Sequence, residues 1–172
     1  MIGWHLAQIN IARAVAPIDD PVMAEFVAQL DAINAVAEAS PGFVWRLQSE
    51  SGNATDIQAY ADPRIIINMS VWETAEALFD YVYKSDHLAL LRRRKDWFDA
   101  ANQPVTAMWW IEAGTTPSVG DAADRLEHLR EHGPTAHAFT FKERYPSPDG
   151  ANGGASMPGP RLIPEEYCDG WA

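Results

Sequence analysis

The sequence predicts an α+β fold, a ferredoxin-like antiparallel sheet with helices on one face. Segments with a two-residue apolar period and segments with a helical period follow one another in the order β-α-β-β-α-β. The 172 residues are 47% hydrophobic and 22% charged, which suits one well-filled core. Residues 146–172 are rich in Gly and Pro. We therefore expect a single domain over residues 1–145, followed by a C-terminal tail.

The first half of the chain contains two predicted strands on either side of a helix. Residues 5–14 alternate as a strand does, and residues 43–48 predict a second strand. Between them, Asp20 and Pro21 mark a helix start, and residues 40–42 (Ser-Pro-Gly) mark its end. The apolar residues of this helix recur every three or four positions: Val22, Phe26, Leu30, Ile33 and Ala37.

A third strand is predicted over residues 64–73, after a linking stretch of about fifteen residues, which is long for a hairpin. Such a stretch is either flexible or part of a binding site. The later elements are, in order, a helix over residues 74–83, a helix over 85–98, a strand over 106–113, and an appended helix over 121–132 and strand over 137–145.

Polar side chains share one face of two predicted strands. Gln8 and Asn10 in the first strand, and Asn68, Ser70 and Trp72 in the third, project to the same side if those strands are neighbours. Amides and an indole suit the orientation of a small organic molecule and the polarisation of a carbonyl or oxyanion. Alternatively, these groups bond to one another across a dimer seam or cap loop backbone.

An antiparallel sheet with helices on one face leaves its other face to meet water, a ligand or another subunit. Two such sheets packed face to face are one physical solution. The sequence therefore allows a homodimer that encloses the sheets.

Five blocks of the sequence resemble a known family: HLAQINIARAVAPIDDP, SPGFVWRL, NMSVWET, YVYKSDH followed by LRRRKDWF, and LEHLREHGPTAHAFTFKERYP. They are similar to a bacterial family of unknown function, itself related to antibiotic-biosynthesis monooxygenases and haem-degrading proteins of the dimeric α+β-barrel superfamily. The resemblance covers about residues 4–146. It implies a homodimeric α+β barrel with a β-lined cavity. The fold hosts oxygenases, haem-dependent enzymes and simple binders, so the resemblance does not fix the reaction.

His87 is the main candidate for acid–base chemistry. It lies at a predicted helix start beside Asp86, on the same helix face as Leu91 and Phe98, so its ring is expected to point toward the core or cavity. A neutral imidazole there is a general base or an axial haem ligand. The structural alternative is a histidine that bonds a backbone group near the helix start.

Further substrate-binding candidates lie in the only basic run and among the tryptophans. Successive helical residues in the run 92–95 point in different directions, so one or two of them, with Arg92 first, are expected to bind a substrate carboxylate. Trp97 and Trp110 are candidates for stacking on a flat substrate. The alternatives are ion pairs with Asp and Glu for the basic residues, and core packing for the tryptophans.

The formal net charge of −11 repels phosphate backbones and anionic lipid, so we expect neither nucleic acid nor membrane as a partner. The lone Cys168 cannot form an internal disulfide, and the N-terminus lacks a secretory pattern, which predicts a cytoplasmic protein. His128 and His132 match the spacing of inverted zinc proteases. No obvious third ligand follows them, so we expect no metal site.

Three functions follow from these patterns. The first is an enzyme resembling cofactor-independent monooxygenases, acting on an aromatic or polyketide-like substrate in a β-lined cavity. There, His87 takes a proton, Asn10 and Asn68 hold the oxyanion, and Trp72 packs on the ring. The second is a haem-dependent enzyme or haem-binding protein with His87 as axial ligand. The third is a non-catalytic ligand-binding or structural dimer.

Overall fold

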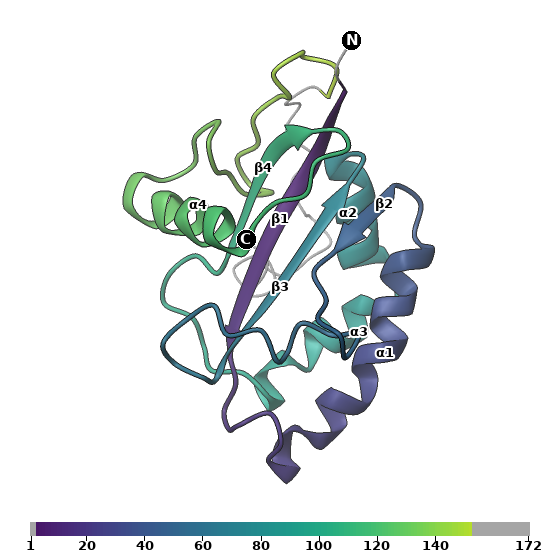
Figure 1. Ribbon diagram of the computed structural model, residues 1–172, viewed down its shortest axis with the longest axis vertical. Helices are drawn as coiled ribbons and strands as arrows, with labels where there is room; N and C mark the ends of the chain where they lie inside the picture. The colour runs from purple at the N-terminus through teal and green to yellow at the C-terminus, as the bar shows by residue number, and fades with distance from the viewer. Residues whose placement is uncertain (1–2, 153–172) are drawn as a thin grey trace.

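The computed structural model describes residues 3–152 (Figure 1). Cys168 and most of the predicted C-terminal tail lie outside this range. The elements are, in chain order, β1 (Trp4–Arg13), the short 3-10 helix η1 (Pro21–Met23), α1 (Ala24–Ala39), β2 (Phe43–Arg46), β3 (Ile65–Trp72), α2 (Ala75–Lys84), α3 (His87–Arg92), the 3-10 helix η2 (Arg94–Asp96), β4 (Thr106–Glu112) and α4 (Val119–His132).

The four strands form one antiparallel sheet in the order β2-β3-β1-β4. This order is the one that two β-α-β units give in a ferredoxin-like fold, so the predicted fold class is confirmed. The register pairs Gln8 with Ser70 and Asn10 with Asn68 across β1 and β3. The predicted polar residues therefore share one face of two neighbouring strands.

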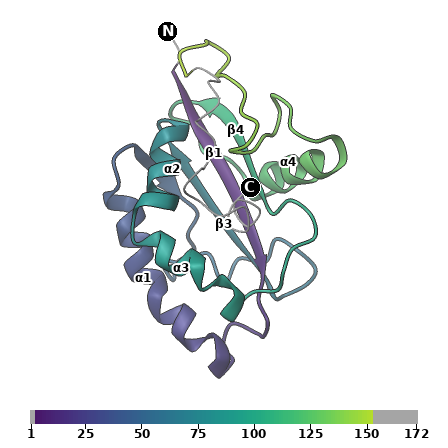
Figure 2. The same ribbon diagram turned by 180° about the vertical axis from the view of Figure 1, so that it is seen from behind.

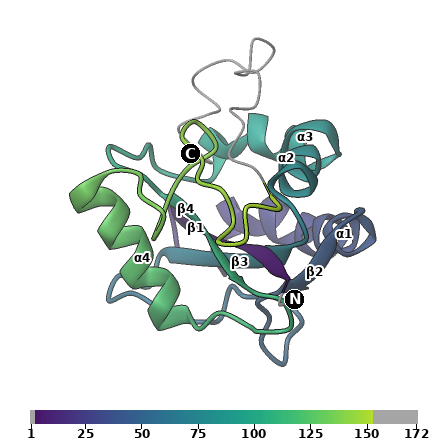
Figure 3. The same cartoon turned by 90° about the horizontal axis from the view of Figure 1, so that it is seen from above.

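The helices divide between the two faces of the sheet. Helices α1, α2 and α3 lie on the face that carries Gln8 and Asn68, and α4 lies on the opposite face (Figures 1 and 3). Seen from behind, α1 and α3 run next to each other over the sheet (Figure 2). The three helices within the ferredoxin-like order thus lie on one face as predicted, and the appended helix adds a layer on the other.

The centre of the face under α4 is buried within the described residues. Its strand residues Ile9, Met69 and Trp109 have exposed fractions of 0%, 1% and 0%, and they pack with Leu126 of α4. The segment between β2 and β3 also packs on this face through Leu47, Ile57, Ala59 and Tyr60. That long connection therefore packs on the sheet and does not line the cavity described below. The homodimer stays a prediction.

Helix starts follow the predicted chemistry. The Asp20 side chain accepts a hydrogen bond from the Val22 backbone N–H, and Pro21 is the first residue of η1. The Thr74 hydroxyl accepts a bond from the Ala77 backbone N–H at the start of α2. These caps fix where the chain turns from strand to helix.

Two predicted elements differ in the structure. The predicted strand over 137–145 is wrong: within it only Phe139 bridges β4, and the backbone turns at once because Thr140 and Glu143 hydrogen-bond to each other. The predicted helix over 85–98 ends at Arg92, and η2 follows it. The chain leaves the helix there because Trp97 is buried with Phe26 and because Phe98 bridges the end of β1.

Within residues 3–152, no helix combines the length and the apolar character needed to cross a bilayer.

Candidate functional site

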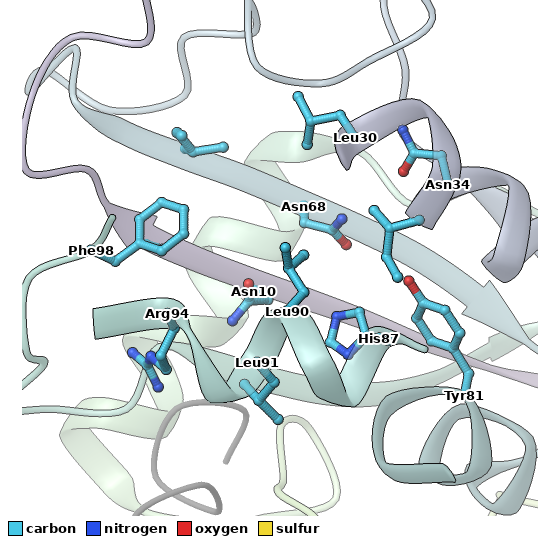
Figure 4. A pocket seen from close by; sticks show the side chains of 13 residues that line it. Asn10, Leu30, Asn34, Asn68, Tyr81, His87, Leu90, Leu91, Arg94 and Phe98 are labelled. Atoms are coloured by element: carbon cyan, nitrogen blue, oxygen red, sulfur yellow. The ribbon is translucent and has the colours of Figure 1, made fainter. Parts of the chain in front are cut away.

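A cavity of about 120 Å³ lies between the polar face of β1 and β3 and the helices α1, α2 and α3 (Figure 4). Apolar side chains such as Leu30, Leu90 and Phe98 form much of its wall. Six polar residues also line it: Asn10, Asn34, Asn68, Tyr81, His87 and Arg94. Apolar walls with a few convergent polar groups are typical of small-molecule sites.

A chain of hydrogen bonds holds Asn68 from behind. Gln8 Nε2 donates to Asn68 Oδ1 at 3.0 Å and to Ser70 Oγ at 2.8 Å, and Trp72 Nε1 donates to the same Ser70 Oγ at 2.8 Å. Gln8 and Ser70 are buried, whereas Asn68 is exposed at the cavity. Because Asn68 Oδ1 accepts from Gln8, the network leaves its amide N–H groups as donors for a bound molecule.

Asn10 lies opposite Asn68 on β1 and is half-buried. Its Nδ2 donates to Thr106 Oγ1 of β4 at 3.1 Å, which uses one of the two amide protons. Figure 4 shows Asn10 and Asn68 projecting from neighbouring strands toward the α3 side of the cavity. The two amides thus come from the two central strands of the sheet, which pair with each other.

His87 is the first residue of α3 and is 6% exposed. Its Nδ1 lies 3.2 Å from the Val82 carbonyl oxygen. A carbonyl only accepts, so Nδ1 carries the proton and Nε2 carries the lone pair of the neutral ring. Burial lowers the pKa of His87 to about 4, against which the bond to Val82 acts only partly. The imidazole is therefore neutral at pH 7.

Tyr81 of α2 connects the imidazole to the indole of Trp72. Its ring centroid lies 4.9 Å from that of His87, and it stacks on Trp72 at 5.1 Å with an interplanar angle of 24°. Burial raises the pKa of Tyr81, so its hydroxyl stays protonated and can donate. The rings of Tyr81 and His87, backed by Trp72, form a wall at one end of the cavity.

The sequence matches the model of the domain of unknown function DUF3291 over residues 5–154. The chain belongs to the DUF3291 family. No curated protein is significantly similar to it in sequence.

The DUF3291 domain is also similar in structure to solved proteins. A protein of unknown function from Nitrosomonas europaea, NE2512, is 13% identical with a TM-score of 0.43, and the match covers 69% of this chain and 99% of that one. SnoaB, a cofactor-independent oxygenase from Streptomyces nogalater, is 15% identical with a TM-score of 0.41, and the match covers 65% of this chain and 95% of SnoaB.

Of the predicted site residues, the DUF3291 domain brings His87, Asn10 and Asn68 together at the cavity. Gln8 and Ser70 lie behind them as supports. The other four predicted residues do not line the cavity. Trp72 is 0% exposed beneath Tyr81, and Trp97 is 2% exposed beside Phe26. Arg92 is exposed on α3, and Trp110 donates to the Tyr145 carbonyl at 2.8 Å.

Three polar lining residues of the DUF3291 domain were not predicted, and the sequence held a signal for two of them. Asn34 follows Leu30 by four residues, so it lies on the apolar face of the first helix. Arg94 belongs to the basic run in which one or two residues were expected to bind a substrate. Nothing in the sequence singles out Tyr81, because its role depends on how α2 lies over Trp72.

Two predicted alternatives concern metals and haem. The described part of the DUF3291 domain has no group of three His, Cys, Asp or Glu arranged to hold a metal ion. His87 is a possible axial ligand by type, but the cavity measures about 120 Å³. Pockets for drug-sized ligands have roughly 300–1,000 Å³, so this cavity is small by comparison, and the haem alternative stays a prediction.

Proposed function

We propose that the domain is a cofactor-independent oxygenase that oxidises a small, electron-rich aromatic or polyketide-like molecule in the cavity between the sheet and α3. The observation that carries the proposal is the convergence of two strand amides and one buried neutral histidine on a single apolar-walled cavity. The sequence resemblance to antibiotic-biosynthesis monooxygenases points in the same direction.

The reaction that suits these groups converts a ring CH2 and O2 into a ring C=O and water. His87 Nε2 accepts a proton from the CH2 carbon, and the electron pair left behind delocalises onto a neighbouring oxygen. The carbanion then gives its electrons to O2. One oxygen atom becomes the new carbonyl, and the other leaves as water with the two hydrogens of the former CH2. Four electrons leave the substrate and four enter O2.

The amides contribute through their N–H groups. Asn68, oriented by Gln8, and Asn10 donate to the substrate oxygen on which negative charge develops. Preorganised donors of this kind are typically worth about 10²–10³ in rate. An anion next to the imidazolium also raises the His87 pKa during the reaction, which offsets the weak basicity of the free buried ring.

The cavity volume sets the size of the reacting part. At about 120 Å³ the cavity is close to the roughly 150 Å³ that suffices for a benzene ring in an apolar protein interior. One ring of the substrate is therefore enclosed, and any further ring extends past the exposed Asn68 toward solvent.

The test is oxygen consumption with a panel of reduced, hydroxylated one- and two-ring aromatics, together with an absorption spectrum taken before and after haemin is added. We expect turnover without added cofactor, a loss of about 10²-fold or more in His87→Gln and Asn68→Ala, and no loss in the exposed controls His132→Gln and Asn102→Ala.

Two outcomes contradict the proposal. A Soret band that needs His87 assigns the cavity to haem instead. Ligand binding without oxygen uptake across the panel identifies a non-catalytic binder.

A further inference from the structure

Arg94 differs from the other arginines of the described residues. Within residues 3–152, seven arginines form an ion pair with a carboxylate: Arg13, Arg46, Arg64, Arg93, Arg125, Arg130 and Arg144. In the same range, the side chains of Arg92 and Arg94 show no hydrogen bond or ion pair. Arg92 is exposed to water, whereas Arg94 is half-buried and lines the cavity.

The backbone fixes Arg94 at this place. It is the first residue of η2, and its carbonyl accepts from the Trp97 N–H at 3.1 Å and the Phe98 N–H at 2.9 Å. Trp97 is buried, so the turn is anchored in the core. Arg93 points elsewhere, because its guanidinium stacks over Trp97 at 4.7 Å and pairs with Glu25. In Figure 4, Arg94 lies at the end of the cavity lining away from Tyr81.

A half-buried guanidinium without a carboxylate is costly. Burial lowers the pKa of Arg94, which reflects the loss of water around the charge. Carboxylates are abundant in this chain, with 24 Asp and Glu against 13 Lys and Arg, and the neighbouring Arg93 uses two of them. The unpaired position of Arg94 therefore fits a site whose counter-charge comes from a bound molecule.

We propose that the cavity selects ligands that carry a carboxylate, which Arg94 binds while the ring of the ligand lies between the strand amides and α3. The substrate class is thus a small aromatic carboxylic acid. This inference rests on the proposed function only in taking the same cavity as the binding site. A net charge of −11 repels anions at long range, so recognition of an acid needs a local cation such as this one.

The experiment compares acids with uncharged amides of the same shape. Isotope-labelled protein is titrated at pH 7 with benzoate and benzamide and with salicylate and salicylamide, and the side-chain amide resonances of Asn10 and Asn68 are followed. We expect each acid to bind more tightly than its amide. Arg94→Gln should lower the binding affinity for the acids by about ten- to a hundredfold and leave the affinity for the amides nearly unchanged.

Two further variants serve as controls for the role of Arg94. Arg92→Gln removes a neighbouring cation that does not line the cavity, and it should leave all four affinities unchanged. Arg94→Lys keeps the charge but not the two-pronged geometry, so it should fall between wild type and Arg94→Gln.

The inference is overturned if the amides bind as tightly as the acids, if Arg94→Gln binds the acids as well as wild type, or if no acid moves the Asn68 resonances at millimolar concentration. None of these readouts involves oxygen. A protein that binds the acids through Arg94 and consumes no oxygen contradicts the proposed function alone.

Discussion

The two faces of the sheet use the same strands for opposite purposes. On one face, Ile9, Met69 and Trp109 are sealed under α4 and the segment between β2 and β3. On the other, the alternate residues Asn10 and Asn68 line an open cavity. A one-residue step along β1 or β3 thus changes the environment from a dry core to a wet site.

Stability and recognition are separated by the two-residue period of the strands. Residues of the sealed face contribute apolar burial, and their loss leaves a cavity. On the open face, buried Gln8 donates to Asn68 and to Ser70, so the exposed Asn68 amide is oriented by a buried neighbour and contributes less apolar burial itself. Substitutions on the two faces should therefore differ, with the largest loss of stability on the sealed face.

Trp109→Ala should be the most damaging of these changes. Trp109 is 0% exposed under α4, with the Arg125 guanidinium 5.2 Å from its ring centroid. We expect a loss of about 3–5 kcal/mol in the free energy of unfolding, measured by urea denaturation. Trp109→Phe should cost much less, because Trp109 Nε1 has no hydrogen-bond partner among the described residues. Equal losses in the two variants would contradict the packing account.

Acid should destabilise the protein through His87. Its folded pKa of about 4 lies below the ordinary value of 6.5, so between these values the unfolded chain binds a proton that the folded protein does not. The free energy of unfolding therefore falls as pH drops through this window, by about 3 kcal/mol in total.

The check is a series of urea curves from pH 7 to pH 4. His87→Gln should remove most of the slope, and the exposed His132→Gln should keep it. If the free energy of unfolding of His87→Gln still falls with pH as it does in wild type, another titratable group is responsible for the pH dependence.

Removing the hydroxyl of Ser70, which lies behind Asn68, should have an intermediate effect on the free energy of unfolding. In Ser70→Ala, Gln8 loses one of its two acceptors and the buried Trp72 indole loses its acceptor. We expect a loss of about 1–3 kcal/mol in the free energy of unfolding, together with weaker ligand binding because Asn68 is less firmly oriented. Ser70→Thr keeps the hydroxyl and serves as the control; if it behaves like alanine, packing rather than hydrogen bonding is responsible.

The sequence predicted the sheet side of the site better than the helix side. Asn10 and Asn68 followed from a period of two in strands that pair in register, a geometry with little freedom. Tyr81 and Arg94 depend on the rotation and position of α2, α3 and η2 over the sheet, which a helical period does not determine. The basic run therefore pointed to Arg92, two residues from the arginine that lines the cavity.

The packing of α4 was also missed, for a related reason. Its sequence is polar on most sides, and its buried face consists of Ala122, Leu126 and Leu129. So narrow an apolar stripe indicates a helix but not the surface that it covers. The sealed face therefore emerged only from the structure, as did the position of the segment between β2 and β3.

The smallest change in stability is expected at the centre of the site. Asn68→Ala should lower the free energy of unfolding by less than Ser70→Ala does, by up to about 1 kcal/mol, because the side chain is exposed and buried Gln8 keeps Ser70 as a second acceptor. The same variant should bind salicylate, whose ring hydroxyl offers an oxygen to Asn68, several-fold more weakly than wild type, measured by titration. A large loss of stability would instead make Asn68 a structural residue of the sheet.

The most direct test of the separation between the faces is a map of resonance shifts on binding of benzoate to the wild-type protein. We predict shifts at the side-chain amides of Asn10 and Asn68 and at the imidazole of His87, with the indole of Trp109 unmoved. Shifts at Trp109 and along α4, with the amides unchanged, would place the ligand on the opposite face and contradict the account.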